Sequence, residues 1–399
     1  MFDPASVTIR GPLGAHAEGF LADLLAQGYA VASAKQLLFL TAHLARWLEA
    51  EGLTLRDLTD ERADAFFLHR RQEGYTVYRT RRGLEPLLRY LRGLGVIDPP
   101  LPQVDDSPLG VLVQEYRTYL RVERGLTDST LHARTVFAKE FAASERPGLD
   151  WHRLTARDVA SYVRRRCRHA SIPACKHTVA KLRSLLRFLY VQGRTPHDLT
   201  SVVPAVAGWR LSGLPPALEA GQVRTLLRSF DGSPVGLRDA AVVRLLLRLG
   251  LRAAEVAALD LDDVDWRLGQ LTVRGKGHCD ARLPLPHDVG RTLAAYLQRG
   301  RPRASTRSLF VRSHAPHTRI RPGAVSNLAQ TALRRAGIAA GGSHLLRHTA
   351  ATELLRAGAS LPEIAHVLRH RHINTTAIYA KVDLASLASL ARPWPEVAS

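Results

Sequence analysis

The chain has 399 residues, enough for two or three domains with hydrophobic cores. It is 46% hydrophobic and 23% charged, as in an ordinary globular protein, and its apolar runs are far shorter than the ~20 residues that span a bilayer. Lysine and arginine (56) exceed aspartate and glutamate (36), and the net charge of +20 is typical of nucleic-acid-binding proteins. A high-GC genome would explain the preference for arginine over lysine, but not the excess of positive charge.

Cysteine usage and the N-terminus predict a cytoplasmic protein. Cys167, Cys175 and Cys279 are irregularly spaced, which favours neither a disulfide framework nor a zinc cluster. The opening residues, MFDPASVTIRGPL, lack a basic segment followed by an apolar one, so we expect no secretion signal. We therefore expect a reducing, cytoplasmic location in a bacterial cell, in association with the nucleoid and without a membrane partner.

Two stretches rich in proline and glycine divide the chain into three segments. DPPLPQVDDSP (98–108) and AVAGWRLSGLPPALEAG (205–221) have the composition of extended connectors and turns. We expect an N-terminal helical domain over residues 1–105, a helical DNA-binding domain over 106–208 and a third domain over 214–399. We expect the first domain to be an accessory DNA-binding domain. Its excess of basic residues is smaller than that of the second domain, which leaves protein–protein contact as the alternative.

The first two segments resemble each other in sequence. RDLTDERADAFF matches HRLTARDVASYV, and LEPLLRYLRGLG (84–95) matches LRSLLRFLYVQG (182–193), at an offset of 96–98 residues. Because the offset stays within this narrow range, we interpret the two segments as a tandem duplication of one helical unit. Apolar residues at i, i+3, i+4 and i+7 favour helices over strands, and Thr155 with Asp158 predicts a capping box.

The second copy is the more basic one. No acidic residue occurs between positions 159 and 197, so pairing along the helices does not account for its charge. A solvated helix face is the alternative to a DNA-binding face. We favour contact with DNA phosphates through eight side chains: Arg164, Arg165, Arg166, Arg168, Lys176, Lys181, Arg183 and Arg187.

The third segment mixes helices with a small sheet. AGQVRTLLRSF and VGLRDAAVVRLLLRLGL predict helices, and QLTVRGKGHCDARLPLP predicts two short strands around a glycine-containing turn. Further helices are expected at 287–299, 323–336, 344–357, 361–368 and 374–380.

Six residues of this segment form a pattern: Arg252, Lys276, His344, Arg347, His370 and Tyr379. In their order and spacing, and in the segment INTTAIYAKV around the tyrosine, they resemble the active site of the tyrosine recombinase (phage integrase) family. The resemblance covers residues 214–382 well and extends more loosely to 108–205. One departure is Arg369, where the family usually has glycine; an arginine there would either crowd the turn or add a phosphate contact.

The resemblance implies a fold that is mainly α with a small β-sheet. Two tandem helical SAM-like DNA-binding domains would precede the catalytic domain. The implied activity is that of a phage- or transposon-borne site-specific integrase, which cleaves and rejoins double-stranded DNA through a 3′-phosphotyrosine without a cofactor or metal. The implied partners are further copies of the chain in a tetramer on DNA, with exchange of the C-terminal tail, and accessory recombination proteins.

The residue types also suit this chemistry when considered by themselves. Arginines offer planar donor pairs that match the oxygens of a phosphodiester, and they stabilise charge that develops on those oxygens. Tyr379 is the candidate nucleophile, with His344 as the base that takes its proton. The family resemblance assigns Lys276 to protonation of the leaving 5′-hydroxyl, and His370 would donate to a non-bridging oxygen.

Several alternatives remain open in the sequence. Arg252 could simply pair with Glu255, which we interpret as a structural residue that orients Arg252 or its helix. His344 and His348 have the spacing of zinc ligands, but Leu345 stands where a metalloprotease has glutamate. For the whole protein, the alternatives are a type IB topoisomerase with the same chemistry and a DNA-binding protein without catalysis.

Overall fold

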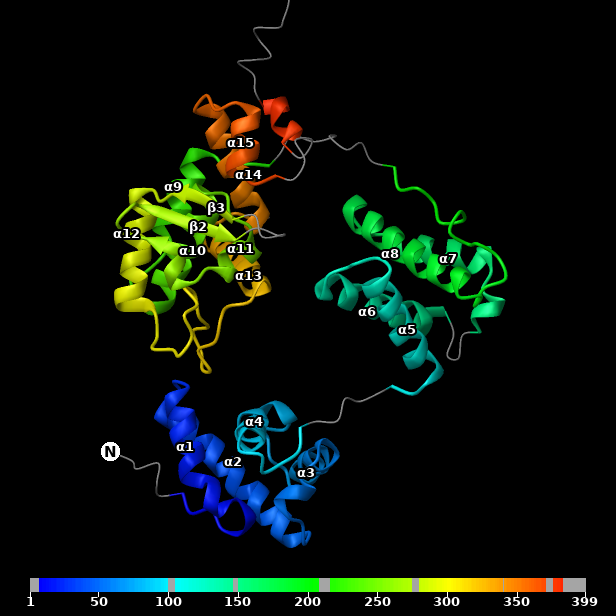
Figure 1. Ribbon diagram of the computed structural model, residues 1–399, viewed down its shortest axis with the longest axis vertical. Coiled ribbons are helices and arrows are strands. Elements are labelled where there is room, and N and C mark those ends of the chain that lie inside the picture. The colour runs from blue at the N-terminus through cyan, green and yellow to red at the C-terminus, as the bar shows by residue number, and fades with distance from the viewer. Residues whose placement is uncertain are drawn as a thin grey trace, which may run out of the picture. The chain divides into compact units, whose positions relative to one another are not determined.

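The computed structural model describes residues 7–99, 105–145, 150–207, 216–274, 280–339, 341–370 and 376–382. These residues are mostly helical and include one three-stranded sheet, which confirms the predicted fold class of mainly α with a small sheet (Figure 1). Of the described residues, 105–145 and 150–207 belong to a compact unit of their own. None of the described helices combines the length and the apolar character that crossing a bilayer requires.

The N-terminal segment is built from helices α1 (Ala17–Ala26), α2 (Val31–Ala50), α3 (Asp60–Gln72) and α4 (Glu85–Gly93). A 3₁₀ turn at Leu55–Asp57 precedes α3, whose first turn is capped by the side chain of Thr59. The apolar faces of these helices share one core, which includes Phe20, Leu44, Phe66, Phe67 and Leu88.

The second unit contains α5 (Pro108–Val122), α6 (Asp128–Glu145), α7 (Ala156–Cys167) and α8 (Ile172–Val191). The predicted capping box at the start of α7 is confirmed, because Thr155 N donates to Asp158 Oδ2 over 3.0 Å and Asp158 N donates to Thr155 Oγ1 over 3.3 Å. Its core includes Tyr116, Phe141, Tyr162 and Phe188.

The order of elements in the N-terminal segment recurs in the second unit. In both, a long helix is followed by a 3₁₀ turn and a threonine-capped helix, which are Leu55–Asp57 with α3 and Trp151–Arg153 with α7. The capping threonines, Thr59 and Thr155, are 96 positions apart, as in the sequence repeat. The recurrence agrees with a duplication; the duplication and the three domain boundaries stay predictions.

The third segment contains seven helices within the described residues: α9 (Ala220–Arg228), α10 (Pro234–Arg248), α11 (Ala253–Ala258), α12 (His287–Ala295), α13 (Pro322–Arg335), α14 (Ser343–Arg356) and α15 (Leu361–Val367). A π turn, Tyr296–Gly300, extends α12. The predicted hairpin is confirmed as β2 (Gln270–Arg274) and β3 (Asp280–Pro284), which pair antiparallel. A two-residue strand, β1 (Val264–Asp265), adds to its edge.

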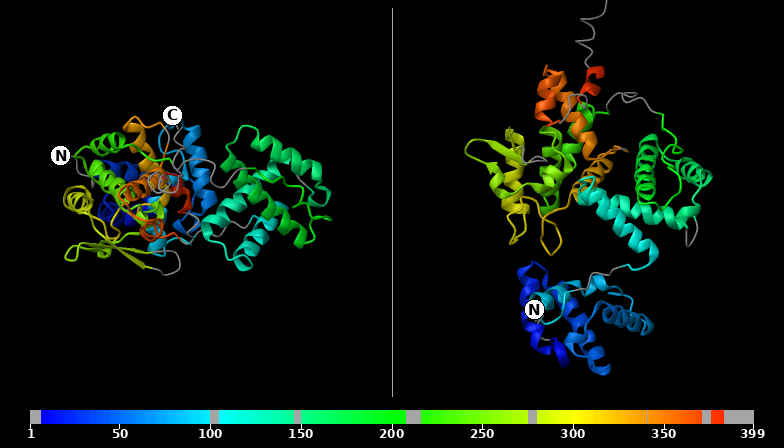
Figure 2. Two further views of the ribbon diagram at one scale, coloured as in Figure 1. Left: turned by 90° about the horizontal axis from the view of Figure 1, so that it is seen from above. Right: turned by 45° about the vertical axis from the view of Figure 1, so that its right-hand side comes forward.

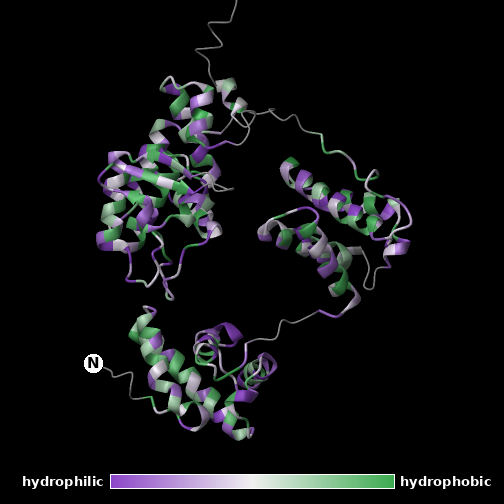
Figure 3. Ribbon diagram, in the orientation of Figure 1, coloured by the Kyte–Doolittle hydropathy of each residue, from purple (hydrophilic) through white to green (hydrophobic). Residues whose placement is uncertain are grey.

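Helix α10 is central to the core of this segment. Five of its side chains within six residues are inaccessible to solvent, so it has a broad buried apolar face: Val242, Val243, Leu245, Leu246 and Leu247. It packs against α12, α13 and α14. The sheet lies at one side of the helices in both views of Figure 2. The helices elsewhere show mixed apolar and polar positions (Figure 3).

A second, smaller apolar cluster joins α14 and α15 to the 3₁₀ helix Ala377–Val382. It consists of Ala351, Ile364, Leu368 and Tyr379. The structure therefore has a 3₁₀ helix where the sequence predicted a helix over 374–380, and residues 371–375 lie outside the described part. Packing of this cluster brings the candidate nucleophile to the face of α14.

Candidate active site

Arg347 lies on α14 and is 6% exposed. Its Nη1 donates to the carbonyl oxygen of Gly250 and its Nη2 donates to the carbonyl oxygen of Leu368. The side chain thus joins the segment before α11 to the end of α15. Burial lowers the pKa of Arg347 to about 10, and the charge of Arg252 adds to this effect, so the guanidinium is still cationic at neutral pH.

Arg252 is the N-cap residue of α11 and stays 41% exposed at its side chain. Its backbone N–H donates to Glu255 Oε2 over 2.8 Å, and Nη1 donates to Glu255 Oε1 over 2.6 Å. Nη2 donates to the carbonyl oxygen of Arg369 over 3.1 Å. The pairing with Glu255 that the sequence left open is present, and the Arg252 side chain is still partly exposed.

Arg369 turns its side chain inward. Its Nη2 donates to Glu255 Oε2 over 2.8 Å, and its side chain is only 11% exposed. Burial raises the pKa of the Glu255 carboxyl, but the hydrogen bond and charge of Arg369 and the hydrogen bonds of Arg252 outweigh burial and hold this pKa below its ordinary value. The buried carboxylate is therefore ionised and lies between two guanidinium groups.

His370 is half-buried beside these arginines. Its Nδ1 lies 2.7 Å from Oγ1 of the buried Thr376. Burial lowers the pKa of His370 to about 4, with further lowering by the charges of Arg347, Arg252 and Arg369. The imidazole is thus neutral near pH 7, with Nδ1 engaged in the contact to Thr376.

Tyr379 is 2% exposed, and its Oη lies 2.7 Å from Nδ1 of His348. Burial raises the pKa of Tyr379 to about 12, although the charge of Arg347 opposes this. Burial also lowers the pKa of His348, with smaller contributions from His344 and Arg347. Both groups are therefore neutral near pH 7, so the phenol O–H donates to the unprotonated Nδ1 of His348.

The structure brings four of the six predicted catalytic residues into one region: Arg252, Arg347, His370 and Tyr379. His344 is exposed in the first turn of α14. Lys276 lies outside the described residues; two positions before it, Arg274 at the end of β2 donates to Asp260 and Asp263. The C-terminal tail that the tail-exchange prediction concerns, residues 383–399, also lies outside them.

Sequence reasoning considered His348 only as a zinc ligand and missed its contact with the tyrosine. The signal was present, because His348 directly follows Arg347 and lies one helical turn beyond His344. Which of the two histidines faces Tyr379 depends on how the 3₁₀ helix packs on α14.

The eight basic residues predicted to contact DNA lie on α7, on α8 and between them, and most are exposed. Several have partners within the chain. Arg166 lies 3.7 Å from Glu140, Arg183 donates to the carbonyl oxygen of Val203 over 2.7 Å, and half-buried Lys181 lies over the Phe137 ring. The basic face is therefore partly involved in holding the second unit together.

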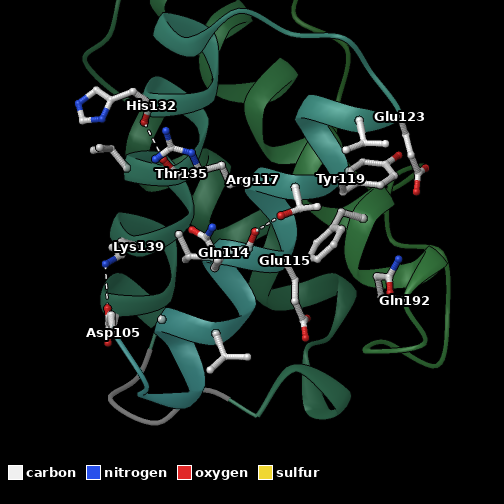
Figure 4. A pocket seen from close by; sticks show the side chains of 17 residues that line it. Asp105, Gln114, Glu115, Arg117, Tyr119, Glu123, His132, Thr135, Lys139 and Gln192 are labelled. Atoms are coloured by element: carbon white, nitrogen blue, oxygen red, sulfur yellow. Dashed lines mark hydrogen bonds and ion pairs between the residues drawn. The ribbon is translucent and has the colours of Figure 1, made fainter. Parts of the chain in front are cut away.

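A groove of about 950 Å³ lies within the second unit, along α5, α6 and α8 (Figure 4). Its lining includes Val111, Val136 and Phe188, and the ion pair of Lys139 with Asp105, 2.9 Å long, is at its edge. None of the predicted catalytic residues that the structure describes lines it.

Gly250, whose carbonyl oxygen accepts from Arg347, has φ +57°, and an added Cβ would overlap the Leu368 side chain. We expect Gly250→Ala to lower the free energy of unfolding by about 2–4 kcal/mol, because left-handed strain and overpacking add. Gly269→Ala is the matched control, since Gly269 has φ +60° with no heavy atom within 4 Å of the added Cβ. Chemical denaturation of both variants checks this; equal losses would contradict a role for close packing at Gly250.

Known proteins resemble this chain in sequence and in fold. Residues 216–385 match the phage integrase family. The chain is 38% identical to y4rA of Sinorhizobium fredii, named as an integrase/recombinase, over 97% of this chain and 95% of that protein. It is 32% identical to tyrosine recombinase XerD of Mycobacterium tuberculosis, over 70% of this chain and 95% of that one.

A solved structure of a λ integrase dimer bound to a COC′ core site has a similar fold. It aligns with a TM-score of 0.55 at 16% identity, covering 81% of this chain and 91% of that one. The sequence similarity to recombinases along nearly the whole chain supports an enzyme that cleaves and rejoins DNA strands in site-specific recombination. The chain belongs to the phage integrase family of tyrosine recombinases.

Proposed function

We propose that this recombinase cleaves DNA through attack of Tyr379 Oη on phosphorus, which forms a 3′-phosphotyrosine and releases a 5′-hydroxyl, without a cofactor. The observation that carries the proposal is the packing of the Tyr379 ring on α14 and α15, with its Oη bonded to the residue that follows Arg347. Arg252 and Arg347 are joined to the same chain segment through the carbonyls of Arg369 and Leu368.

The roles follow from the chemistry of the groups. The P–O bond to the tyrosine forms as the P–O5′ bond breaks, and charge rises on the non-bridging oxygens, where Arg252 and Arg347 would donate. His370, neutral near pH 7, would donate a further hydrogen bond. The phenol proton must leave Tyr379, and we infer that His348 or His344 accepts it; Lys276 would protonate the leaving oxygen.

The described arrangement is a resting one. Tyr379 Oη donates to His348 and is almost fully covered, so a phosphodiester reaches it only if the 3₁₀ helix Ala377–Val382 moves. For attack, the phenol must leave the buried environment that raises its pKa. We infer that DNA binding or contact with another copy of the chain in a tetramer supplies this movement.

We infer that the substrate is double-stranded DNA and that several copies of the chain act together, with or without accessory proteins. The net charge of +20 and the exposed arginines of α7 support DNA binding. The related λ integrase is a dimer bound to a core site in its solved structure. The α7 and α8 basic residues would contact phosphates and position the third segment on the duplex.

Trapping the covalent intermediate tests the function. The gene is expressed beside its flanking DNA, protein–DNA adducts are recovered after denaturation, and the attached DNA ends are sequenced. We expect one recurrent cleavage sequence, and a nucleotide 3′-phosphate on the peptide that contains Tyr379. Absence of an adduct on Tyr379 would refute the proposal. Adducts at scattered sites, with plasmid relaxation and no new junctions, would indicate topoisomerase-like activity instead.

A further inference from the structure

Arg369 occupies a strained backbone position. Its φ is +54°, in the left-handed region where a residue with a Cβ is disfavoured and glycine is not. Its side chain is nevertheless packed against the protein interior, with an exposed fraction of 11%. An arginine at a position that suits glycine raises the question of what its guanidinium contributes.

The Arg369 guanidinium shares a carboxylate with Arg252. Glu255 Oε2 accepts from Arg369 Nη2 over 2.8 Å, while Glu255 Oε1 accepts from Arg252 Nη1 over 2.6 Å. The carbonyl oxygen of Arg369 also accepts from Arg252 Nη2 over 3.1 Å. Arg369 therefore holds the Arg252 guanidinium in two ways. Its carbonyl oxygen accepts a hydrogen bond from Arg252, and its side chain shares the Glu255 carboxylate with Arg252.

The same contacts fix the chain that leads into His370. Arg369 Nη1 donates to the carbonyl oxygen of Val367 over 2.6 Å, which closes the turn at the end of α15. Leu368, between them, accepts from Arg347. The backbone on the N-terminal side of His370 is thus tied to both Arg252 and Arg347.

We propose that Arg369 is a positioning residue for strand cleavage, which directs the Arg252 guanidinium and the His370 backbone by sharing the Glu255 carboxylate with Arg252. The inference rests on the proposed function. Arg369 does not contact DNA in this role, which distinguishes it from an added phosphate ligand.

The net charge of Arg252, Glu255 and Arg369 is a second reason to expect that Arg369 contributes to cleavage. One carboxylate between two guanidinium groups leaves a net charge of +1. Without Arg369, Glu255 would neutralise Arg252 alone, and less positive charge would remain to stabilise the phosphorane-like transition state. Arg369 would therefore affect the rate of cleavage more than the affinity for DNA.

The rate of covalent adduct formation tests the proposal, measured in single turnover on a nicked duplex that carries the recovered cleavage sequence. We expect Arg369→Gly to slow the reaction about 10- to 100-fold, as small misplacements of catalytic groups do, with unchanged DNA affinity. Stability should change little, because glycine relieves the backbone strain. Arg369→Lys should recover much of the rate, since an ammonium group can also pair with Glu255. Arg356→Gly, at the exposed end of α14, is the control for loss of positive charge.

Two further measurements separate positioning from a general structural effect. In a Glu255→Gln background, Arg369→Gly should slow the reaction less than it does in the wild-type background, because the shared carboxylate is already absent and only the loss of positive charge remains. The NMR titration of His370, assigned with His370→Asn, should move upward from its low pKa in Arg369→Gly. Within the described residues, the groups whose charges lower the pKa of His370 are Arg347, Arg252, Arg369 and His348, and only Arg369 is lost.

Four results would overturn the proposal: wild-type rate in Arg369→Gly, no recovery in Arg369→Lys, equal slowing in the Glu255→Gln background, or loss of cooperative unfolding in Arg369→Gly. The last would make Arg369 a residue that holds the fold. Failure of the wild-type chain to form an adduct would overturn the proposed function itself, and the inference with it.

Discussion

Tyr379→Phe is expected to fold and bind DNA like the wild-type chain and to form no covalent adduct. The substitution removes only Oη, and the ring keeps its packing against Ile364 and Leu368. Because Tyr379 is the proposed nucleophile and phenylalanine has no hydroxyl to replace it, adduct formation should fall by about 10⁴-fold or more. Loss of the hydrogen bond to His348 should cost only about 1 kcal/mol of stability. Denaturing gels of the nicked-duplex reaction measure the adduct directly.

Tyr296→Phe is the matched control for this experiment. Tyr296 is also fully buried, in the larger core around α10, and its Oη accepts a hydrogen bond from Val311 N over 3.4 Å. Its substitution removes a buried hydroxyl without touching the candidate site, so the adduct should form at the normal rate. An adduct in Tyr379→Phe, or its loss in Tyr296→Phe, would assign the nucleophile elsewhere.

Arg347→Lys is expected to slow adduct formation by about 10²–10³-fold, the range seen when one donor to a developing oxyanion is removed. Lysine keeps the charge but has no planar pair of donors, so it cannot hold the carbonyls of Gly250 and Leu368 together. One buried carbonyl would lose its partner, which should also cost about 1–3 kcal/mol of stability. Adduct kinetics and chemical denaturation measure the two effects separately.

Arg356→Lys provides the comparison on the same helix. Arg356 is exposed in the last turn of α14, so we expect neither kinetics nor stability to change beyond experimental scatter. If Arg347→Lys reacted as fast as Arg356→Lys, Arg347 would be a structural residue that ties α11 to α15, and the catalytic assignment would have to rest on Arg252.

Local patterns in the sequence predicted much of the fold. The helical periodicity around α10, the hairpin of β2 and β3 and the capping box at Thr155 all depend on neighbours within a few residues, and each is present. The sequence did not predict strand β1, because two residues are too few to show an alternation of apolar and polar positions. The 3₁₀ form of Ala377–Val382 was also missed, since six residues do not distinguish the two helix types.

Only part of the candidate site could be predicted from the sequence. Order and spacing singled out Arg252, Arg347, His370 and Tyr379, but not the contacts that orient them. The pair of Arg369 and Glu255 joins positions 114 residues apart, and the φ of +54° at Arg369 is a property of the folded turn. Neither follows from local pattern. The choice of His348 over His344 as the partner of Tyr379 likewise depends on the packing of two distant segments.

The covered phenol of Tyr379 has a consequence for the genome in which the proposed enzyme works. With a pKa of about 12, roughly one molecule in 10⁵ carries the ionised oxygen at pH 7. A recombinase that scans a chromosome meets vastly more unrelated DNA than target. If Tyr379 is the nucleophile, as proposed, its protonated and shielded state during these passing encounters would leave the host's strands unbroken until the correct assembly forms.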